Sequence, residues 1–241
     1  MKNIVIIGAS GHGGMVLECV EKEGKYSVLG FLDTYKERGT AYNGFEILGN
    51  ENDILHLIEQ YKLFGVIIAI GNNWIRKMMV DKLTALKPDL RFVTVIHPSS
   101  IISRNVQIGR GTVIMPGTII NSNSKIGDFC ILNTNASLGH DGEMKDYSSI
   151  SPGVCTGGNL ILGEYSAISL GANIIENITI GKHSIIGAGS LVVKNVEDKS
   201  LVYGSPARPI KYRSKEDPYL KGDKSIQKFN GLHSKKSKLH L

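Results

Sequence analysis

Residues 108–149 read IGRGTV-IMPGTI-INSNSK-IGDFCI-LNTNAS-LGHDGE-MKDYSS when the chain is divided every six residues. The same frame runs without insertion from Ile96 to Glu197, and sixteen of its seventeen hexapeptides begin with Ile, Leu, Met or Val. Thr156 is the one departure. Two residues before each of these positions stands a small residue or Val, except at Leu160 and Ile178. A period of six is neither the 3.6 of a helix nor the 2 of a simple strand.

This period fits one side of a triangular prism, in which a short strand ends at a corner and points one aliphatic side chain inward. Three sides, and so three hexapeptides, make one coil. The sequence therefore predicts an all-β solenoid whose coils are hydrogen-bonded to their neighbours. Glycine often follows the aliphatic residue, as at Gly109 and Gly127, where it suits a corner. The solenoid accounts for much of the high glycine content, 28 of 241 residues.

The first hundred residues follow a different pattern, in which apolar runs alternate with helix-like stretches. Strands are expected over residues 3–7, 28–32, 65–70 and 91–96, and helices over 15–23, 51–61 and 73–86. Alternation of this kind predicts a small parallel α/β domain of the Rossmann-like class. We therefore expect an α/β domain over residues 1–95, the solenoid over 96–212 and a basic tail over 213–241.

A glycine cluster, GASGHGG over residues 8–14, lies between the first expected strand and helix. Such a turn lets main-chain N–H groups face a phosphate at a helix N-terminus, and Asp33 ends the next strand, where a ribose is often bound. A turn that only tightens strand-to-helix packing is the alternative. A second loop, Gly71-Asn72-Asn73, ends in a possible N-cap, and Trp74 beside it is expected to pack rather than stack on a base. The candidate nucleotide-binding residues are Gly8, Ser10, Gly11, His12, Gly13, Asp33, Gly71, Asn72, Asn73 and Arg76.

Charge and cysteine content exclude several classes of protein. Of the formal net charge of +6, five units lie in residues 213–241, so the body is nearly neutral and nucleic-acid binding is not expected. Three cysteines without a CxxC pair argue against a disulfide framework or a structural zinc site. They favour a reducing compartment, and without a signal peptide or membrane helix we expect a cytoplasmic protein without a bound metal. The tail offers only a weak case for contact with an anionic membrane.

The repeat resembles the left-handed β-helix acyltransferases, and the ending Gly204-Ser205-Pro206-Ala207-Arg208 resembles a closure found in many acetyl-CoA-dependent members. The GASGHG turn, Phe31-Leu32-Asp33 and the AIGNN loop with Arg76 narrow the resemblance. Together they resemble the sugar acetyltransferases grouped with the sialic acid O-acetyltransferase and the bacillosamine-pathway N-acetyltransferase. The resemblance implies a left-handed parallel β-helix, acetyl-CoA as co-substrate and a homotrimer with active sites between subunits.

The segment NTNASLGHD, residues 133–141, holds the candidate catalytic group. Histidine is suited to accept a proton near neutral pH, and His140 occupies an outward position of its hexapeptide. The resemblance implies that His140 is the general base, oriented by Asp141, for direct attack of a sugar amine on acetyl-CoA. Adjacent strand residues point oppositely, so this pairing requires a corner. The resemblance also implies cofactor-binding positions at Ser149, Gly158, Gly171, Gly187 and Ala188, with Ser149 in place of a second histidine.

The main hypothesis is an N-acetyltransferase acting on the 4-amino group of a nucleotide-linked 4-amino-4,6-dideoxy sugar. An O-acetyltransferase of a sialic acid or related sugar is the nearest alternative. A nucleotide-binding oxidoreductase lacks a Tyr-x-x-x-Lys pair, and a metalloenzyme of the γ-carbonic anhydrase type would need further histidines near His140. A non-catalytic solenoid is the remaining alternative. A nucleophilic cysteine is not expected, because Cys130 and Cys155 fall at or beside inward positions.

Overall fold

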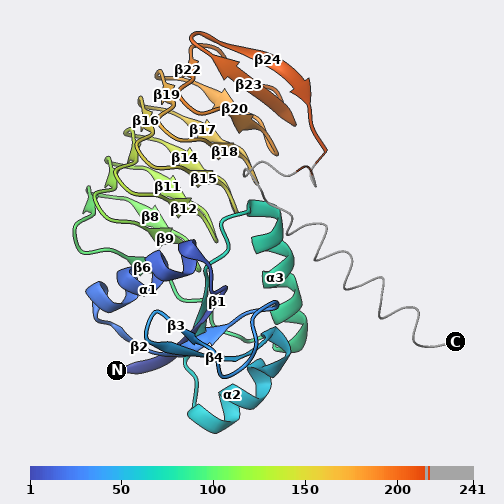
Figure 1. Cartoon of the computed structure of the whole chain (residues 1–241). Coiled ribbons are helices and arrows are strands. Elements are labelled where there is room, and N and C mark those ends of the chain that lie inside the picture. Colours follow the sequence, from blue (N-terminus) through green and yellow to red (C-terminus); the bar gives the residue numbers. More distant parts are fainter. Residues whose placement is uncertain (215–216, 218–241) are drawn as a thin grey trace, which may run out of the picture.

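The computed structural model describes residues 1–214 and residue 217, which form an α/β layer followed by a stack of parallel β-coils (Figure 1). The α/β layer packs against the first coils of the stack. Its elements are β1 (Lys2–Ile7), α1 (Gly11–Glu23), β2 (Tyr26–Leu32), β3 (Ala41–Tyr42), β4 (Phe45–Gly49), the 3-10 turn η1 (Glu51–Asp53), α2 (Ile54–Tyr61), β5 (Gly65–Ile68) and α3 (Asn73–Leu86).

The sheet of the α/β layer has the strand order β3-β4-β2-β1-β5, with β1 parallel to both of its neighbours. Ile4 and Ile6 of β1 pack toward α1, whereas Val5 and Ile7 pack toward α2 and α3. All four side chains are buried. A parallel strand covered on both faces needs such a continuous apolar run, which is why β1 shows no polar alternation.

The α/β layer differs from the sequence expectation in four places. α1 begins at Gly11 rather than near residue 15, so most of the glycine cluster lies in its first turn. The expected helix over 51–61 is the turn η1 followed by α2. The expected strand over 91–96 is one isolated bridge, Val66 to Phe92, and a two-residue strand that belongs to the solenoid. The hairpin β3–β4 was not predicted.

The solenoid contains one two-residue strand in every hexapeptide. The strands are β6 (Val95–Ile96), β7 (Ile101–Ile102), β8 (Gln107–Ile108), β9 (Val113–Ile114), β10 (Ile119–Ile120), β11 (Lys125–Ile126), β12 (Ile131–Leu132), β13 (Ser137–Leu138), β14 (Glu143–Met144), β15 (Ser149–Ile150), β16 (Cys155–Thr156), β17 (Ile161–Leu162), β18 (Ala167–Ile168), β19 (Asn173–Ile174), β20 (Thr179–Ile180), β21 (Ile185–Ile186) and β22 (Leu191–Val192).

These strands form three parallel sheets in which each strand pairs with the strand three hexapeptides away. The second residue of each strand points inward, and from Ile114 to Val192 these side chains are at most 6% exposed. The position two residues earlier is also buried and is often a hydroxyl residue, whose Oγ donates to a main-chain carbonyl of the next coil, as Ser166 does to Gly181 at 2.6 Å. The predicted hexapeptide frame is confirmed in every coil.

The last coil ends in an antiparallel hairpin of β23 (Ser200–Gly204) and β24 (Ala207–Tyr212), and β23 extends the sheet that contains β21. At the other end, α1 packs on the solenoid, because Val16 and Val20 share a buried cluster with Val95, Val113 and Met115. The described residues include no helix with the length and apolar character needed to span a membrane.

Candidate functional site

His140 stands at a corner of the solenoid between β13 and β14. It is the third residue of its hexapeptide, two residues after the inward-facing Leu138. Its side chain is 63% exposed. A corner residue of this kind can reach a ligand that lies along the coils without disturbing the core.

Asp141 holds the imidazole of His140 in one orientation. Asp141 has a left-handed backbone with φ of 55°, which turns its side chain to the same side as that of its neighbour. Its Oδ2 lies 2.7 Å from His140 Nδ1, and its Oδ1 accepts a hydrogen bond of 3.1 Å from Asn123 Nδ2. These hydrogen bonds, first from His140 and then from Asn123, lower the pKa of Asp141. Because a carboxylate only accepts, Nδ1 carries the proton and Nε2 is left as the basic nitrogen.

Gly158 lies directly beside the imidazole ring, one coil later in the stack. A Cβ placed on Gly158 would be 2.5 Å from both Cε1 and Nε2 of His140. A Cβ on Gly139 would collide with the carbonyl oxygen of Gly157. The corner that carries His140 therefore depends on glycines at these two contact points.

The other predicted cofactor-binding positions are spread over the solenoid. Ser149 lies on β15, in a different sheet from the strands on either side of His140, and is 8% exposed. Gly171 occupies a left-handed corner with φ of 62° and open space in front of it, and Ala188 is exposed. Gly187 is covered by the ring of Tyr203, which a Cβ at this glycine would overlap. In one chain, Gly158 is the member of this set that touches His140.

The cysteines are free thiols, and none has the properties of an activated nucleophile. Burial raises the pKa of Cys130 to about 11 and that of Cys19 to about 12. Cys155 points outward from β16 and is exposed. The described residues contain no group of three or more His, Cys, Asp or Glu side chains that could hold a metal ion.

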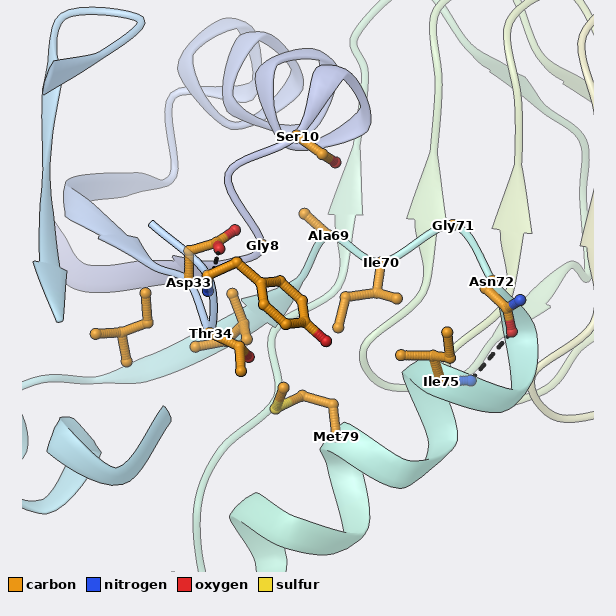
Figure 2. Close-up of a pocket in the computed structure, with 13 residues that line it drawn as sticks. Gly8, Ser10, Asp33, Thr34, Ala69, Ile70, Gly71, Asn72, Ile75 and Met79 are labelled. Atoms are coloured by element: carbon orange, nitrogen blue, oxygen red, sulfur yellow. Dashed lines mark hydrogen bonds between the residues drawn. The ribbon is translucent and has the colours of Figure 1, made fainter. Parts of the chain in front are cut away.

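A cavity of about 320 Å³ opens at the ends of β1, β2 and β5 (Figure 2). Gly8, Ser10, Asp33, Gly71 and Asn72, all expected from the sequence, line it. Its remaining wall is mostly apolar and consists of Ile7, Leu32, Thr34, Tyr35, Ala69, Ile70, Ile75 and Met79. Ligands of parallel α/β sheets bind at this edge of the sheet, beyond the carboxyl ends of the strands.

Two side chains shape the loops around the cavity. Asp33 Oδ2 accepts from the N–H of Ala9 at 2.8 Å, and Oδ1 accepts from the N–H groups of Tyr35 and Lys36. Asn72, rather than Asn73, is the N-cap of α3, because its Oδ1 accepts from the N–H groups of residues 74 and 75. Asp33 therefore ties the glycine turn to the loop after β2, in addition to facing the cavity.

Arg76 and Asn73, expected to bind the ligand, lie instead at the contact between α3 and the solenoid. Arg76 is fully buried and donates from Nε to the carbonyl of Phe129 at 2.8 Å and from Nη2 to the carbonyl of Tyr147 at 3.1 Å. Its Nη1 donates to the carbonyls of residues 70 and 71, in the cavity wall. Asn73 Nδ2 donates to the carbonyl of Ser166 at 3.1 Å. The sequence around an arginine that follows such a loop is the same whether the arginine binds a ligand or attaches the helix to a neighbouring domain.

Gly11, His12 and Gly13 begin α1 behind the cavity and do not line it. Gly13 packs on the carbonyl of Gly8, which leaves no room for a side chain. The Nε2 atom of His12 is buried and has no hydrogen-bond partner among the described residues. Burial, together with the charge of Arg76, lowers the pKa of His12 to about 4. The ring of His12 is thus enclosed at Nε2 and is not that of an exposed loop residue.

A column of aromatic rings forms the surface on which α3 docks, and sequence reasoning missed it. Phe129, Tyr147, Tyr165 and His183 occupy the same left-handed corner in successive coils, and neighbouring rings stack with centroids 4.6 to 5.5 Å apart. Trp74 of α3 packs edge-on against Tyr165, so it has the packing role predicted for it. The recurrence of these rings every third hexapeptide was the available signal.

Comparison with known proteins identifies the family of the chain. The PglD N-terminal domain family matches residues 3–83. The structure of a histidine-to-asparagine variant of perosamine N-acetyltransferase from Caulobacter crescentus, in complex with CoA and GDP-perosamine, is 33% identical with a TM-score of 0.82, and the match covers 88% of this chain and 98% of that one. The chain belongs to the hexapeptide-repeat sugar N-acetyltransferases of the bacillosamine-pathway type.

Two further members of this sugar N-acetyltransferase family resemble the chain. The acetyltransferase domain of PglB from Neisseria gonorrhoeae FA1090, in complex with acetyl coenzyme A, is 33% identical with a TM-score of 0.80, over 87% of this chain and 99% of that one. UDP-N-acetylbacillosamine N-acetyltransferase from Bacillus subtilis (strain 168) is 38% identical over 121 residues. That match spans 46% of this chain and half the length of the curated relative. The predicted fold class, an α/β domain followed by a left-handed parallel β-helix, is confirmed.

Proposed function

We propose that the protein transfers the acetyl group of acetyl-CoA to the 4-amino group of a nucleotide-linked 4-amino-4,6-dideoxy sugar, for the synthesis of a surface glycan. The pairing of His140 with Asp141 on an exposed corner of the solenoid carries this proposal. The relatives support the substrate class, since one was crystallised with GDP-perosamine and another is named for UDP-N-acetylbacillosamine. Structures of the perosamine enzyme with one histidine replaced by asparagine or alanine fit a role for a histidine.

In this proposal His140 is the general base. Its Nε2 accepts the proton that the sugar amine loses as the amine nitrogen attacks the thioester carbonyl. Asp141 stabilises the resulting imidazolium, because its Oδ2 is already bound to Nδ1. The same proton then passes to the departing sulfur of CoA, so the base is regenerated and no acyl-enzyme forms. A positioned base of this kind contributes about a hundredfold to ten-thousandfold to the rate.

Gly158 supplies the second element of the site. Its main-chain N–H forms no hydrogen bond within the described part of the chain. This N–H adjoins the His140 ring, so we assign it to the oxygen that becomes negative as the amine attacks. Ser149, Gly171, Gly187 and Ala188 belong in this proposal to the path of the CoA arm. The covering ring of Tyr203 makes Gly187 the weakest member of that set.

The cavity beside Asp33 is proposed to hold the nucleotide of the sugar substrate. Its mostly apolar wall suits a flat base, and the α1 N-terminus behind Ser10 has no acidic residue in its first turn to compete with a phosphate. Gly11, His12 and Gly13 border that helix end, whereas Asn73 and Arg76 fix the loop that forms the cavity wall.

We propose a homotrimer in which each active site lies between two subunits. A single chain leaves His140 63% exposed, with Ser149 on a different sheet. The outer surface of the solenoid also exposes Ile101, Ile119, Ile161, Leu170 and Ile175. A proposed cytoplasmic location fits the three free thiols. The proposed weak membrane contact falls on the tail, most of which lies outside the described residues.

The deciding experiment measures thiol release from acetyl-CoA with UDP-, dTDP- and GDP-linked 4-amino sugars and with free sialic acid. We expect turnover with an amino sugar nucleotide and its loss in His140→Asn. His56→Asn, an exposed histidine on α2, is the control and retains activity. Turnover with sialic acid alone would replace the proposal by O-acetylation, and turnover with none of these acceptors would contradict both.

The assignment of the cavity has a separate test. Ile70 is half-buried and its side chain borders the cavity, so Ile70→Trp narrows the space for a nucleotide (Figure 2). We expect the KM for the nucleotide sugar to rise by about tenfold or more, with the KM for acetyl-CoA unchanged. Equal changes in the two KM values would show that the nucleotide does not bind in this cavity.

A further inference from the structure

The hydrogen-bonded ladder between coils is irregular beside His140. Neighbouring two-residue strands of the described solenoid pair at both residues, as Ile119 and Ile120 of β10 do with Ser137 and Leu138 of β13. The exception is the next step of the same sheet, from β13 to β16, where only Ser137 pairs, with Cys155. The missing pair is that of Leu138 with Thr156, and Leu138 stands two residues before His140.

The side chain of Thr156 causes this irregularity. At equivalent places, the residue after the strand donates its N–H to a main-chain carbonyl of the next coil, as Asn121 does to Leu138 at 3.0 Å. The N–H of Gly139 donates instead to Oγ1 of Thr156 at 3.1 Å. The same hydroxyl donates to the carbonyl of Ser137 at 3.2 Å.

The consequence falls on the peptide group that precedes His140. From the other side, Ser124 Oγ donates to the carbonyl of Gly139 at 2.8 Å. The main chain at Gly139 is therefore fixed by buried hydroxyls of the coils before and after it. Ser124 repeats a contact found in other coils, such as that of Ser166, whereas the contact of Thr156 is a local departure.

The sequence position of Thr156 makes the contact more notable. It is the one place in the hexapeptide frame where an inward aliphatic residue is replaced. A hydroxyl there gives up apolar burial, and its two hydrogen bonds compensate for the desolvation of its oxygen.

We propose that Thr156 is a positioning residue for the acetyl transfer, which sets the direction of the His140 side chain through the N–H of Gly139. This inference rests on the proposed role of His140 as the base. An aliphatic residue at position 156 would let Gly139 N–H return to the regular main-chain ladder and would reorient the peptide before His140. A shift of about 1 Å at a reacting group can reduce a rate a hundredfold.

The test compares Thr156→Val with Thr156→Ser and with the matched control Thr118→Val. Thr118 is also buried and its hydroxyl also bonds main-chain carbonyls, but at another place in the coil. We expect Thr156→Val to lower kcat by about tenfold to a hundredfold, with both KM values within about twofold of the natural protein. Thr156→Ser keeps the hydroxyl and restores kcat, and Thr118→Val keeps kcat whatever its melting temperature.

A fourth measurement separates this inference from the proposed function. In the His140→Asn background, the kcat that remains should not fall further with Thr156→Val, because Thr156 acts through His140. If His140→Asn is inactive but Thr156→Val turns over at the natural rate, Thr156 is not a positioning residue. The same conclusion follows if Thr156→Ser fails to restore kcat. If His140→Asn is fully active, the proposed base is wrong and the inference falls with it.

Discussion

The imidazole of His140 lies against the main chain of Gly158, so closely that a Cβ at Gly158 would be 2.5 Å from Nε2. Gly158 has no left-handed backbone, so its conformation would accept alanine and only the imidazole would have to move. We expect Gly158→Ala to lower kcat by about a hundredfold while the protein stays folded. Gly153→Ala is the control, because open space faces that glycine and its cost is backbone strain alone. An unchanged kcat in Gly158→Ala would show that catalysis does not require the His140 imidazole to lie against Gly158.

The two hydrogen bonds to Asp141 predict how its carboxyl titrates. They lower its pKa in the folded protein, so this carboxylate stabilises the fold above the pKa of the unfolded chain. That contribution is lost as the pH falls through the folded pKa. Removal of the Asn123 donor in Asn123→Gly should raise the pKa of Asp141, as measured by carboxyl NMR titration. Asn177 is also at a left-handed corner but is bonded to Asn159, so Asn177→Gly should leave the pKa of Asp141 unchanged. An unchanged titration in Asn123→Gly would contradict the prediction.

His12 predicts a loss of stability in mild acid. Its pKa is lowered to about 4, so the folded protein holds this imidazole neutral where the unfolded chain protonates it. Stability should therefore fall between pH 6.5 and about 4, by up to about 3 kcal/mol from this group. His12→Gln should lose less over that window in denaturant unfolding, whereas His56→Gln, exposed on α2, should follow the natural protein. Parallel curves for all three would refute the prediction.

Arg76 predicts a large structural effect without a direct role in binding. Arg76→Met leaves several buried carbonyls unpaired between α3 and the solenoid, which should cost about 3 to 5 kcal/mol. Lys77→Met on the same helix removes only a surface ion pair with Asp81 and should cost less than about 1 kcal/mol. Chemical denaturation measures both. A similar cost for the two variants would mean that Arg76 does not fasten α3 to the solenoid.

The sequence predicted the solenoid well, because its aliphatic frame depends only on neighbours three hexapeptides away, and these follow from the repeat itself. It also placed His140 and Asp141 at a corner, where the left-handed φ of Asp141 brings them together. It assigned Arg76 to the ligand, because the docking of α3 on the solenoid depends on contacts 53 and 71 residues apart in the chain. It marked Thr156 as a departure but gave no reason for it, because the reason is a hydrogen bond to a glycine N–H.

The docking of α3 on stacked corner rings also fixes how far the cavity of the α/β layer lies from His140 within one chain. Arg76 and Trp74 attach the α/β layer to the coils of Phe129, Tyr147 and Tyr165, and His140 lies in that same stack. Adjacent strands are spaced about 4.8 Å apart, so the height of the stack can change only in steps of one whole coil. An insertion or deletion preserves both the inward frame and the alignment of the corners only if it adds or removes complete coils. Under the proposed function, an acceptor sugar of different length would therefore be accommodated by the loops around the cavity, because the coils allow no smaller change in spacing.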